Sequence, residues 1–286
     1  RMTPDRFREC LDAIGWTGRE LARRLFPGDR TAKAALALAG RGDRYAVAGA
    51  EPPYRIPALA IDHHPADIGI PTGHLRGGAH GHAAFFTESF VDELAHAAGT
   101  EALSYRIAML GGDPRLARCL STAASLGGWD GGGRGGGQGI ACHAFRGSRV
   151  AVLAEARIEG GRIRVDRLVA AADCGRLVNP DLVRQQIEGG LVFGMAQALG
   201  GSTGYTAGLP DARGFGAPGG RPGGRGVALP RLADVPDVTV ELIRSEAEPG
   251  GVGELAVPPV APAIANALWS ATGTRLRSLP LVPGPS

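Results

Sequence analysis

A single carboxylate stands out in the last part of the sequence because of the residues on either side of it. In "PGGVGELAVPP" (249–259), Glu254 follows three glycines and precedes two prolines. Glycines let a backbone approach another group closely, and prolines stiffen the chain that follows. Taken alone, the pattern favours a solvated glutamate in a surface turn. The alternative is a carboxylate held in place for proton transfer, which other residues must support.

A glutamine on an amphipathic pattern is the second candidate group. "NPDLVRQQIEGGLVFGMAQAL" opens with Asn179 as an N-cap and predicts a helix. On a 3.6-residue period Gln186 shares a face with Leu182 and Gly190, where an unpaired amide costs about 1–3 kcal/mol. Such a residue is most often a satisfied core amide. Three glycines close behind it, each costing about 1 kcal/mol relative to Ala, indicate instead that another backbone or a ligand lies near.

An arginine on a glycine hinge is the third candidate. In "IPTGHLRGGAH" (70–80), Arg76 is followed by Gly77 and Gly78. A guanidinium presented in this way can grip a phosphate or a carboxylate through two parallel hydrogen bonds. An arginine in an ordinary surface turn is equally compatible with the pattern.

The remaining polar clusters do not predict a metal site. Five histidines lie between positions 63 and 82, and His80 and His82 would share one face of a strand, but no acidic or thiol partner lies near them in sequence. The four cysteines show no ligand spacing, which indicates reduced thiols. "GGGRGGGQGIA" (131–141) lacks the preceding strand of a dinucleotide-binding fingerprint, so we interpret it as a loop that enters a strand.

Composition bounds the possible partners and location. The net charge is +3, but residues 1–44 hold ten Arg or Lys and six Asp or Glu, so the remainder carries about −1 and has no general attraction for polyanions. No apolar run approaches the length of a membrane span. The first 25 residues carry too many charges for a signal peptide, so we expect a cytoplasmic protein without a membrane or nucleic-acid partner.

The periodicity predicts an α+β fold in which mixed sheets pack against helices. The order of elements lacks a strict βαβ rhythm, which disfavours a doubly wound sheet. A helix that begins at Thr87 and ends at Gly99 should bury Phe90 and Val91. Three strands should form a meander with turns at 147–148 and 160–161. The strands are expected at 139–145, 150–159, 162–173 and 237–245, and the other helices at 101–109, 114–126, from 179, and from 262 to about 273.

Four motifs together resemble one protein family in their order and spacing. They are "YRIPALAIDHHPADIGIPTGHLRGGAH", "AFFTESFVDELAHAAG", "DCGRLVNPDLVRQQIEGGLVFGMAQAL" and "PGGVGELAVPPVAPAIANAL". The family is the molybdenum hydroxylases of the xanthine dehydrogenase and aldehyde oxidase superfamily, and the similar branch is that of isoquinoline 1-oxidoreductase beta subunits. The resemblance covers residues from about 54 to 280 and matches the C-terminal molybdopterin-binding region.

The resemblance implies a role for each residue singled out above. Glu254 matches a general base in the hydroxylation of N-heterocycles or aldehydes with water-derived oxygen, and Gln186 matches a glutamine that hydrogen-bonds the pterin. Arg76 and Gly77 match an arginine–glycine segment near the molybdenum, and Val252 and Gly253 belong to the cofactor-binding loop that carries Glu254.

The resemblance also implies cofactors and partners. The cofactor is molybdopterin with molybdenum, in its cytosine dinucleotide form, and iron–sulfur clusters lie on a small [2Fe–2S] partner subunit. The family's large subunits are several hundred residues long, so the N-terminal half of the site is expected from another polypeptide. Without it, the isolated chain is expected to be inactive.

Residues outside this match predict the domain organisation. "MTPDRFRECLDAIGWTGRELARRL" resembles the first helices of a helix-turn-helix domain, but "TAKAALALAG" offers only Lys33 where base-contacting side chains should follow. We therefore expect a partial helix-turn-helix-like segment at 1–44, a linker at 45–60 and the molybdopterin-binding domain at 61–286. A DNA-binding regulator and an inactive gene-fusion remnant are the alternative functions.

Overall fold

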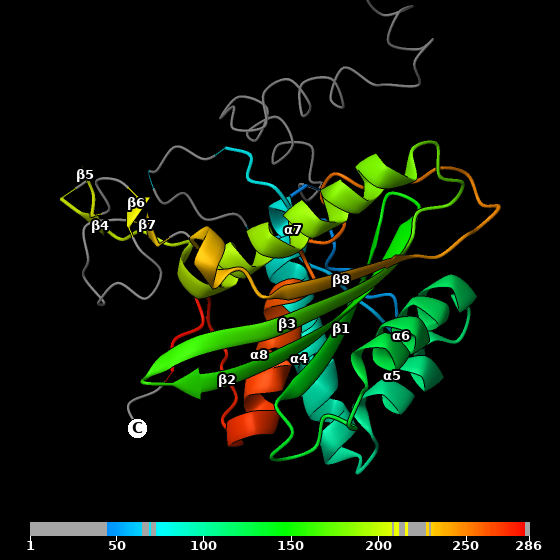
Figure 1. Ribbon diagram of the computed structural model, residues 1–286, viewed down its shortest axis with the longest axis horizontal. Coiled ribbons are helices and arrows are strands. Elements are labelled where there is room, and N and C mark those ends of the chain that lie inside the picture. The colour runs from blue at the N-terminus through cyan, green and yellow to red at the C-terminus, as the bar shows by residue number, and fades with distance from the viewer. Residues whose placement is uncertain are drawn as a thin grey trace, which may run out of the picture.

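The computed structural model describes residues 45–64, 69, 73–207, 209–211, 215–216, 227–228 and 230–283. The predicted helix-turn-helix-like segment therefore lies outside the described residues, so the domain boundaries stay a prediction. In the described part, five α-helices surround a mixed four-stranded sheet, which confirms the predicted α+β class (Figure 1). No helix of this part is long and apolar enough to cross a membrane.

The sheet is the predicted meander with one added strand. Strands β1 (Gln138–Phe145), β2 (Ser148–Glu159) and β3 (Arg162–Asp173) are antiparallel, and β8 (Asp237–Leu242) pairs in parallel with β3. Arg146 and Gly147 turn the first hairpin with positive φ angles, and Gly160 and Gly161 turn the second. The second turn lies at the predicted 160–161, whereas the first lies one residue before the predicted 147–148, since Ser148 is already the first residue of β2. A two-residue hairpin of this kind needs φ > 0 at both turn positions.

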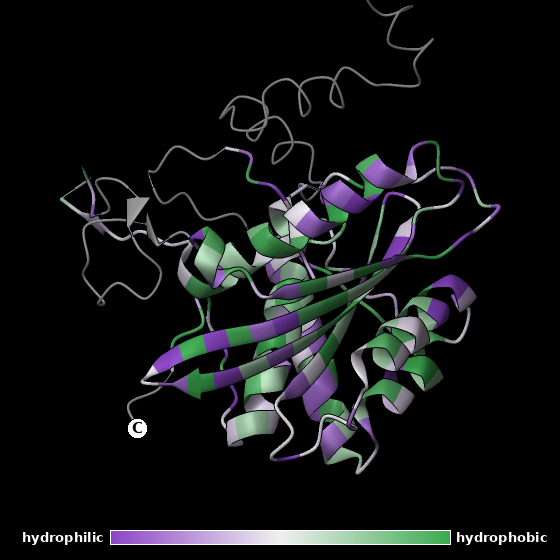
Figure 2. Ribbon diagram, viewed as in Figure 1, coloured by the Kyte–Doolittle hydropathy of each residue, from purple (hydrophilic) through white to green (hydrophobic). Residues whose placement is uncertain are grey.

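Helices cover both faces of the sheet. Helix α8 (Val260–Thr272) packs against β1 and β2 on one face, beside α7 (Pro180–Gly200), while α5 (Ala102–Leu110) and α6 (Pro114–Gly127) cover the other face. Gly139 lets α8 lie directly on β1, since a Cβ there would be 2.2 Å from the Ala267 nitrogen. The outer end of the β2–β3 hairpin extends beyond the helices, and Figure 2 shows its alternating polar and apolar residues.

The helix boundaries follow from the caps. Asn179 accepts a hydrogen bond from the Leu182 nitrogen at the start of α7, Glu101 caps α5, and Asp113 caps α6. Helix α8 ends at the left-handed Gly273, as predicted, and begins two residues before the expected Pro262. Shorter elements complete the described part: β4 (Tyr205–Thr206), β5 (Leu209–Pro210), β6 (Phe215–Gly216), β7 (Val227–Ala228) and the 3-10 helix η1 (Leu232–Asp234).

Helix α4 (Gly78–Ala97) differs from its prediction in two respects. It begins nine residues before Thr87, because Gly77 serves as its N-cap in the left-handed region and the small residues that follow pack inward. Its buried side is also partly polar: Phe90 is 57% exposed, whereas Glu88 and Asp92 are buried. The hydropathy pattern placed Phe90 inside because it could not include a compensating charge from another helix.

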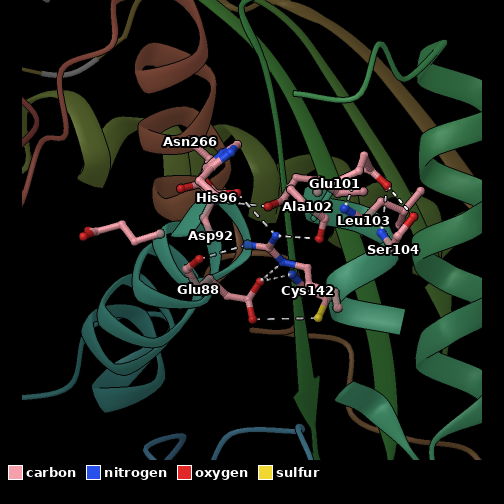
Figure 3. Close-up of polar contacts among 12 residues, drawn as sticks. Glu88, Asp92, His96, Glu101, Ala102, Leu103, Ser104, Cys142 and Asn266 are labelled. Carbon is pink, nitrogen blue, oxygen red and sulfur yellow. Dashed lines mark hydrogen bonds and ion pairs between the residues drawn. The ribbon is translucent and has the colours of Figure 1, made fainter. Parts of the chain in front are cut away.

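That charge is Arg106 of α5, which is fully buried. Its partners Glu88 and Asp92 are labelled in Figure 3. Its Nε donates to Glu88 Oε2 at 3.0 Å and its Nη1 to Asp92 Oδ1 at 3.3 Å. Arg275 of the C-terminal segment also donates to Asp92, at 2.7 Å. Burial alone would raise the pKa of Asp92, but hydrogen bonds and the two arginines hold it at about 2. The network fixes α4 against α5 and the C-terminal segment.

Candidate functional site

Arg76 brings the predicted polar residues of three separate segments together. Its Nε donates to the carbonyl oxygen of Gly253 at 2.6 Å, and its Nη2 donates to the backbone and side-chain oxygens of Gln186 at 3.0 and 3.1 Å. The guanidinium therefore links α7 to the loop that carries Glu254. These contacts span 110 and 177 residues of sequence, so only the folded chain creates this cluster.

The backbone around Arg76 is shaped for close approach. Gly77 has φ +96°, and a Cβ at this position would lie 2.9 Å from Val257 Cγ1. A side chain here would thus push the arginine segment away from the glutamate loop. Because glycine has no Cβ, Gly77 lets the backbone after Arg76 lie close to Val257.

The glycines of α7 serve the same purpose. A Cβ at Gly190 would lie 3.0 Å from the Ala256 Cβ, and one at Gly194 would lie 2.8 Å from the Val257 carbonyl oxygen. Helix α7 therefore packs against the turn that follows Glu254. This confirms the prediction that another backbone lies close to these glycines.

The predicted surroundings of Gln186 are wrong. Gln186 is exposed and Leu182 is 58% exposed, because the buried side of α7 is displaced around the helix axis. That side consists of Ile187, Gly190, Leu191, Gly194, Met195 and Ala198. Small residues alone did not reveal which side of the helix faces the loop. The side-chain oxygen of Gln186 is satisfied by Arg76 rather than by a core partner.

The loop before Glu254 is docked on the first hairpin of the sheet. The Gly251 nitrogen donates to the Arg146 carbonyl oxygen at 2.9 Å, and a Cβ at Gly250 would lie 2.2 Å from Ser148 Oγ. After Glu254 the chain turns back, with the Val257 nitrogen donating to the Glu254 carbonyl oxygen at 3.2 Å. Glu254 itself is half-buried. Its segment is thus fixed on both sides.

The charges of Arg76 and Glu254 act on each other. Burial lowers the pKa of the Arg76 guanidinium, and the negative charge of Glu254 opposes part of that change. The half-buried carboxylate therefore belongs to the same electrostatic environment as the cluster around Arg76. This environment pairs a carboxylate with a fixed cation.

A pair of histidines lies beside this cluster and was missed in the sequence. His80 Nδ1 is 2.8 Å from His143 Nε2, and Phe145 packs edge-on against His80. Burial lowers the pKa of His143 to about 3, and the charge of His80 adds to the effect. The expectation that His80 and His82 share one face of a strand is wrong, since both lie on α4. In the described ranges, no group of three or more His, Cys, Asp or Glu residues is arranged to hold a metal ion.

Comparison with known proteins identifies a family model and several relatives that the chain resembles. Residues 135–217, which include β1–β3 and all of α7, match the family model described as "Molybdopterin cofactor-binding domain". The chain is 29% identical over 237 residues to the beta chain of an isoquinoline 1-oxidoreductase from Brevundimonas diminuta, covering 80% of this chain and 29% of the relative. It is 28% identical over 266 residues to a nicotinate dehydrogenase subunit from Pseudomonas putida, covering 86% of this chain and 21% of the relative. The chain thus spans less than a third of either relative.

A solved structure supports the fold. The aldehyde oxidoreductase from Desulfovibrio gigas superposes with a TM-score of 0.56 at 14% sequence identity. The match covers 72% of this chain and 40% of that chain. At this identity the likeness shows a shared fold.

Proposed function

We propose that this chain, which carries a molybdopterin cofactor-binding domain of the molybdenum hydroxylase family, forms the cofactor side of an active site that hydroxylates N-heterocycles or aldehydes with oxygen from water. The observation that carries the proposal is the clamp made by Arg76 on Gln186 and Gly253. It joins a cation, an amide and a carboxylate-bearing loop in one place.

The donors of this clamp fit a ligand rich in hydrogen-bond acceptors. Arg76 can only donate, so the Gln186 atom that faces it is the oxygen, and the amide nitrogen points to the other side. Nη1 of Arg76 makes no hydrogen bond to the described residues, and a Cβ at Gly189 would lie 3.7 Å from it. Because Gly189 has no side chain to cover Nη1 of Arg76, an acceptor oxygen of a ligand could approach this N–H group. These two donors would hold the pterin and its phosphate.

The chemistry is divided between the cofactor and the chain. When bound, the molybdenum cofactor supplies a two-electron acceptor for the oxidation. Glu254 takes a proton at its carboxylate from the water that provides the oxygen, since it is half-buried and fixed by the turn to Val257. Arg76 holds the loop at Gly253, one residue away, and so fixes the position of this base.

The rest of the proposal concerns parts beyond this chain. Because the chain spans 29% and 21% of the two relatives, the substrate pocket is completed by another part of a large subunit. We assign the cytosine dinucleotide form of the cofactor and a small [2Fe–2S] subunit as electron acceptor. Aromatic N-heterocycles and aldehydes are the substrate classes.

The test is assembly of the chain with the remaining part of a large subunit and a [2Fe–2S] subunit, followed by metal analysis and turnover in ¹⁸O-labelled water. The wild-type assembly is expected to contain molybdenum and to transfer labelled oxygen. Glu254→Gln is expected to keep the molybdenum and to lower kcat about 100-fold or more, the usual effect of a lost general base. Glu248→Gln, whose side chain is 91% exposed, is the matched control.

Two results would contradict the proposal. The first is an assembly that contains no molybdenum. The second is a Glu254→Gln assembly that contains the metal and turns over as fast as the Glu248→Gln control. That second result would show that Glu254 is not the general base, whereas an assembly that contains molybdenum but does not turn over would indicate an inactive remnant of such a subunit.

A further inference from the structure

One face of α7 contacts Arg76 both at its guanidinium and at its backbone carbonyl oxygen. Gln186, Phe193 and Gln197 lie on this face at helical spacings, with Gly189 and Gly190 between the first two. Gln186 binds the guanidinium, and the Phe193 ring centroid lies 5.9 Å from its central carbon. Gln197 Nε2 donates to the backbone carbonyl oxygen of Arg76 at 3.1 Å. The helix thus contacts both ends of the arginine.

The contact made by Gln197 adds a restraint to the Arg76–Gly77 peptide, which lies at the centre of a turn that is closed by a 2.9 Å hydrogen bond from the Gly78 nitrogen to the Leu75 carbonyl oxygen. The carbonyl oxygen of Arg76 belongs to the peptide bond that leads into Gly77, whose φ of +96° lies in the region that glycine adopts freely. A glycine hinge does not by itself select one orientation for the preceding side chain. The Gln197 side chain lies between this segment and α4, with its oxygen 4.0 Å from a Cβ placed at Gly81. It therefore fixes the hinge from the side of α7.

We infer that Gln197 is a positioning residue that sets the direction of Arg76, and through it the amide of Gln186 and the carbonyl of Gly253. It would do so by holding the Arg76–Gly77 peptide on the same helix that carries Gln186. The role toward the cofactor rests on the proposed function. The role toward Arg76 does not, since every contact lies within the chain.

The first test needs no cofactor. In the isolated ¹⁵N-labelled chain, the Arg76 Nε–H signal is assigned by its loss in Arg76→Lys, and its hydrogen exchange is measured. The hydrogen bond to Gly253 should protect this group in the wild type. Gln197→Leu is expected to speed its exchange about fivefold, the change that loss of one neutral hydrogen bond gives.

Two further variants make this test decisive. Gln185→Leu removes an exposed glutamine from the same helix and is expected to exchange like the wild type. Gln197→Glu keeps the size and polarity of the side chain but removes the donor, so it should fold and should exchange at least as fast as Gln197→Leu. Equal exchange in Gln197→Glu, Gln185→Leu and the wild type would overturn the inference.

The second test asks whether Gln197 acts through Arg76. Molybdenum retained after dialysis is measured in the assembled large subunit for Gln197→Leu, Arg76→Lys and the double variant. Gln197→Leu is expected to lower retention about fivefold in the wild-type background and to add no loss in the Arg76→Lys background, because residues that act as a unit are not additive. The same fractional loss in both backgrounds would contradict positioning through Arg76. A wild-type assembly without molybdenum would refute the proposed function, while the exchange measurement would still decide the role of Gln197.

Discussion

Replacing Arg106 by Met tests whether the buried network holds α4 in place. The substitution keeps much of the side-chain length but removes the guanidinium that pairs with Glu88 and Asp92. It also removes donors to the backbone oxygens of Glu88 and Ala102, at 2.9 and 3.1 Å. Breaking a buried ion pair by deleting one partner costs about 3–5 kcal/mol. Both carbonyls keep their intrahelical hydrogen bonds, since Glu88 lies within α4 and Ala102 within α5, so the lost ion pair accounts for most of the cost.

The remaining contacts set a limit to the loss. Asp92 keeps Arg275 at 2.7 Å, so its charge stays compensated. Glu88 keeps the Tyr54 hydroxyl at 2.6 Å and the nitrogen and thiol of Cys142 at 3.1 and 3.9 Å, none of which is a cation. One buried charge rather than two is thus left uncompensated. We expect a decrease of about 4 kcal/mol in the free energy of unfolding, which is a large part of the 5–15 kcal/mol typical of a domain.

Urea unfolding followed by circular dichroism measures this decrease. Adding Glu88→Gln to Arg106→Met should recover about half of the loss, because it removes the uncompensated charge. Arg157→Met is the matched control: Arg157 forms exposed ion pairs with Glu159 and Asp166 on the β2–β3 hairpin, and their loss should leave the midpoint almost unchanged. A decrease of less than about 1 kcal/mol for Arg106→Met, or no recovery in the double variant, would refute this account of the network.

Two further predictions concern the sheet and its neighbours. The pKa of His143 falls from 6.5 to about 3 on folding, so between these pH values only the unfolded chain takes up this proton and the free energy of unfolding falls as pH decreases. His143→Gln should reduce that slope by up to about 1.4 kcal/mol per pH unit. An unchanged slope in urea titrations at several pH values would contradict this prediction. Gly139→Ala places a Cβ 2.2 Å from the Ala267 nitrogen and should cost about 3 kcal/mol or more, whereas Gly133→Ala meets no atom within 4 Å and should unfold at the wild-type midpoint.

The sequence predicts the parts of this fold that depend on local rules. The meander follows from two turns that contain glycine, and α7 begins at Asn179 because its side chain caps the helix. Helix α8 ends at Gly273 for a similar local reason. In each case the residues that decide the structure lie within a few positions of the boundary.

The parts that were wrong depend on residues far away in sequence. The buried side of α4 accommodates Glu88 only because Arg106, 18 residues later, supplies a charge. The side of α7 that carries Gln186 is exposed, and its oxygen is satisfied by Arg76 from 110 residues earlier. No sequence pattern marks His143 as a residue near the site, because its partner His80 lies 63 residues away on another element. A periodic pattern describes one element at a time and cannot include such partners.

The candidate site depends on the same kind of long-range contact. Its motifs were found separately, and nothing in their spacing requires that Arg76 should bind both Gln186 and Gly253. The glycines make this possible, since side chains at Gly77 or Gly190 would separate the three segments. Their conformational cost in a helix or at a hinge is about 1 kcal/mol each, and close packing of the segments offsets it. The same glycines that weaken α7 as a helix therefore allow it to hold the arginine beside the glutamate loop.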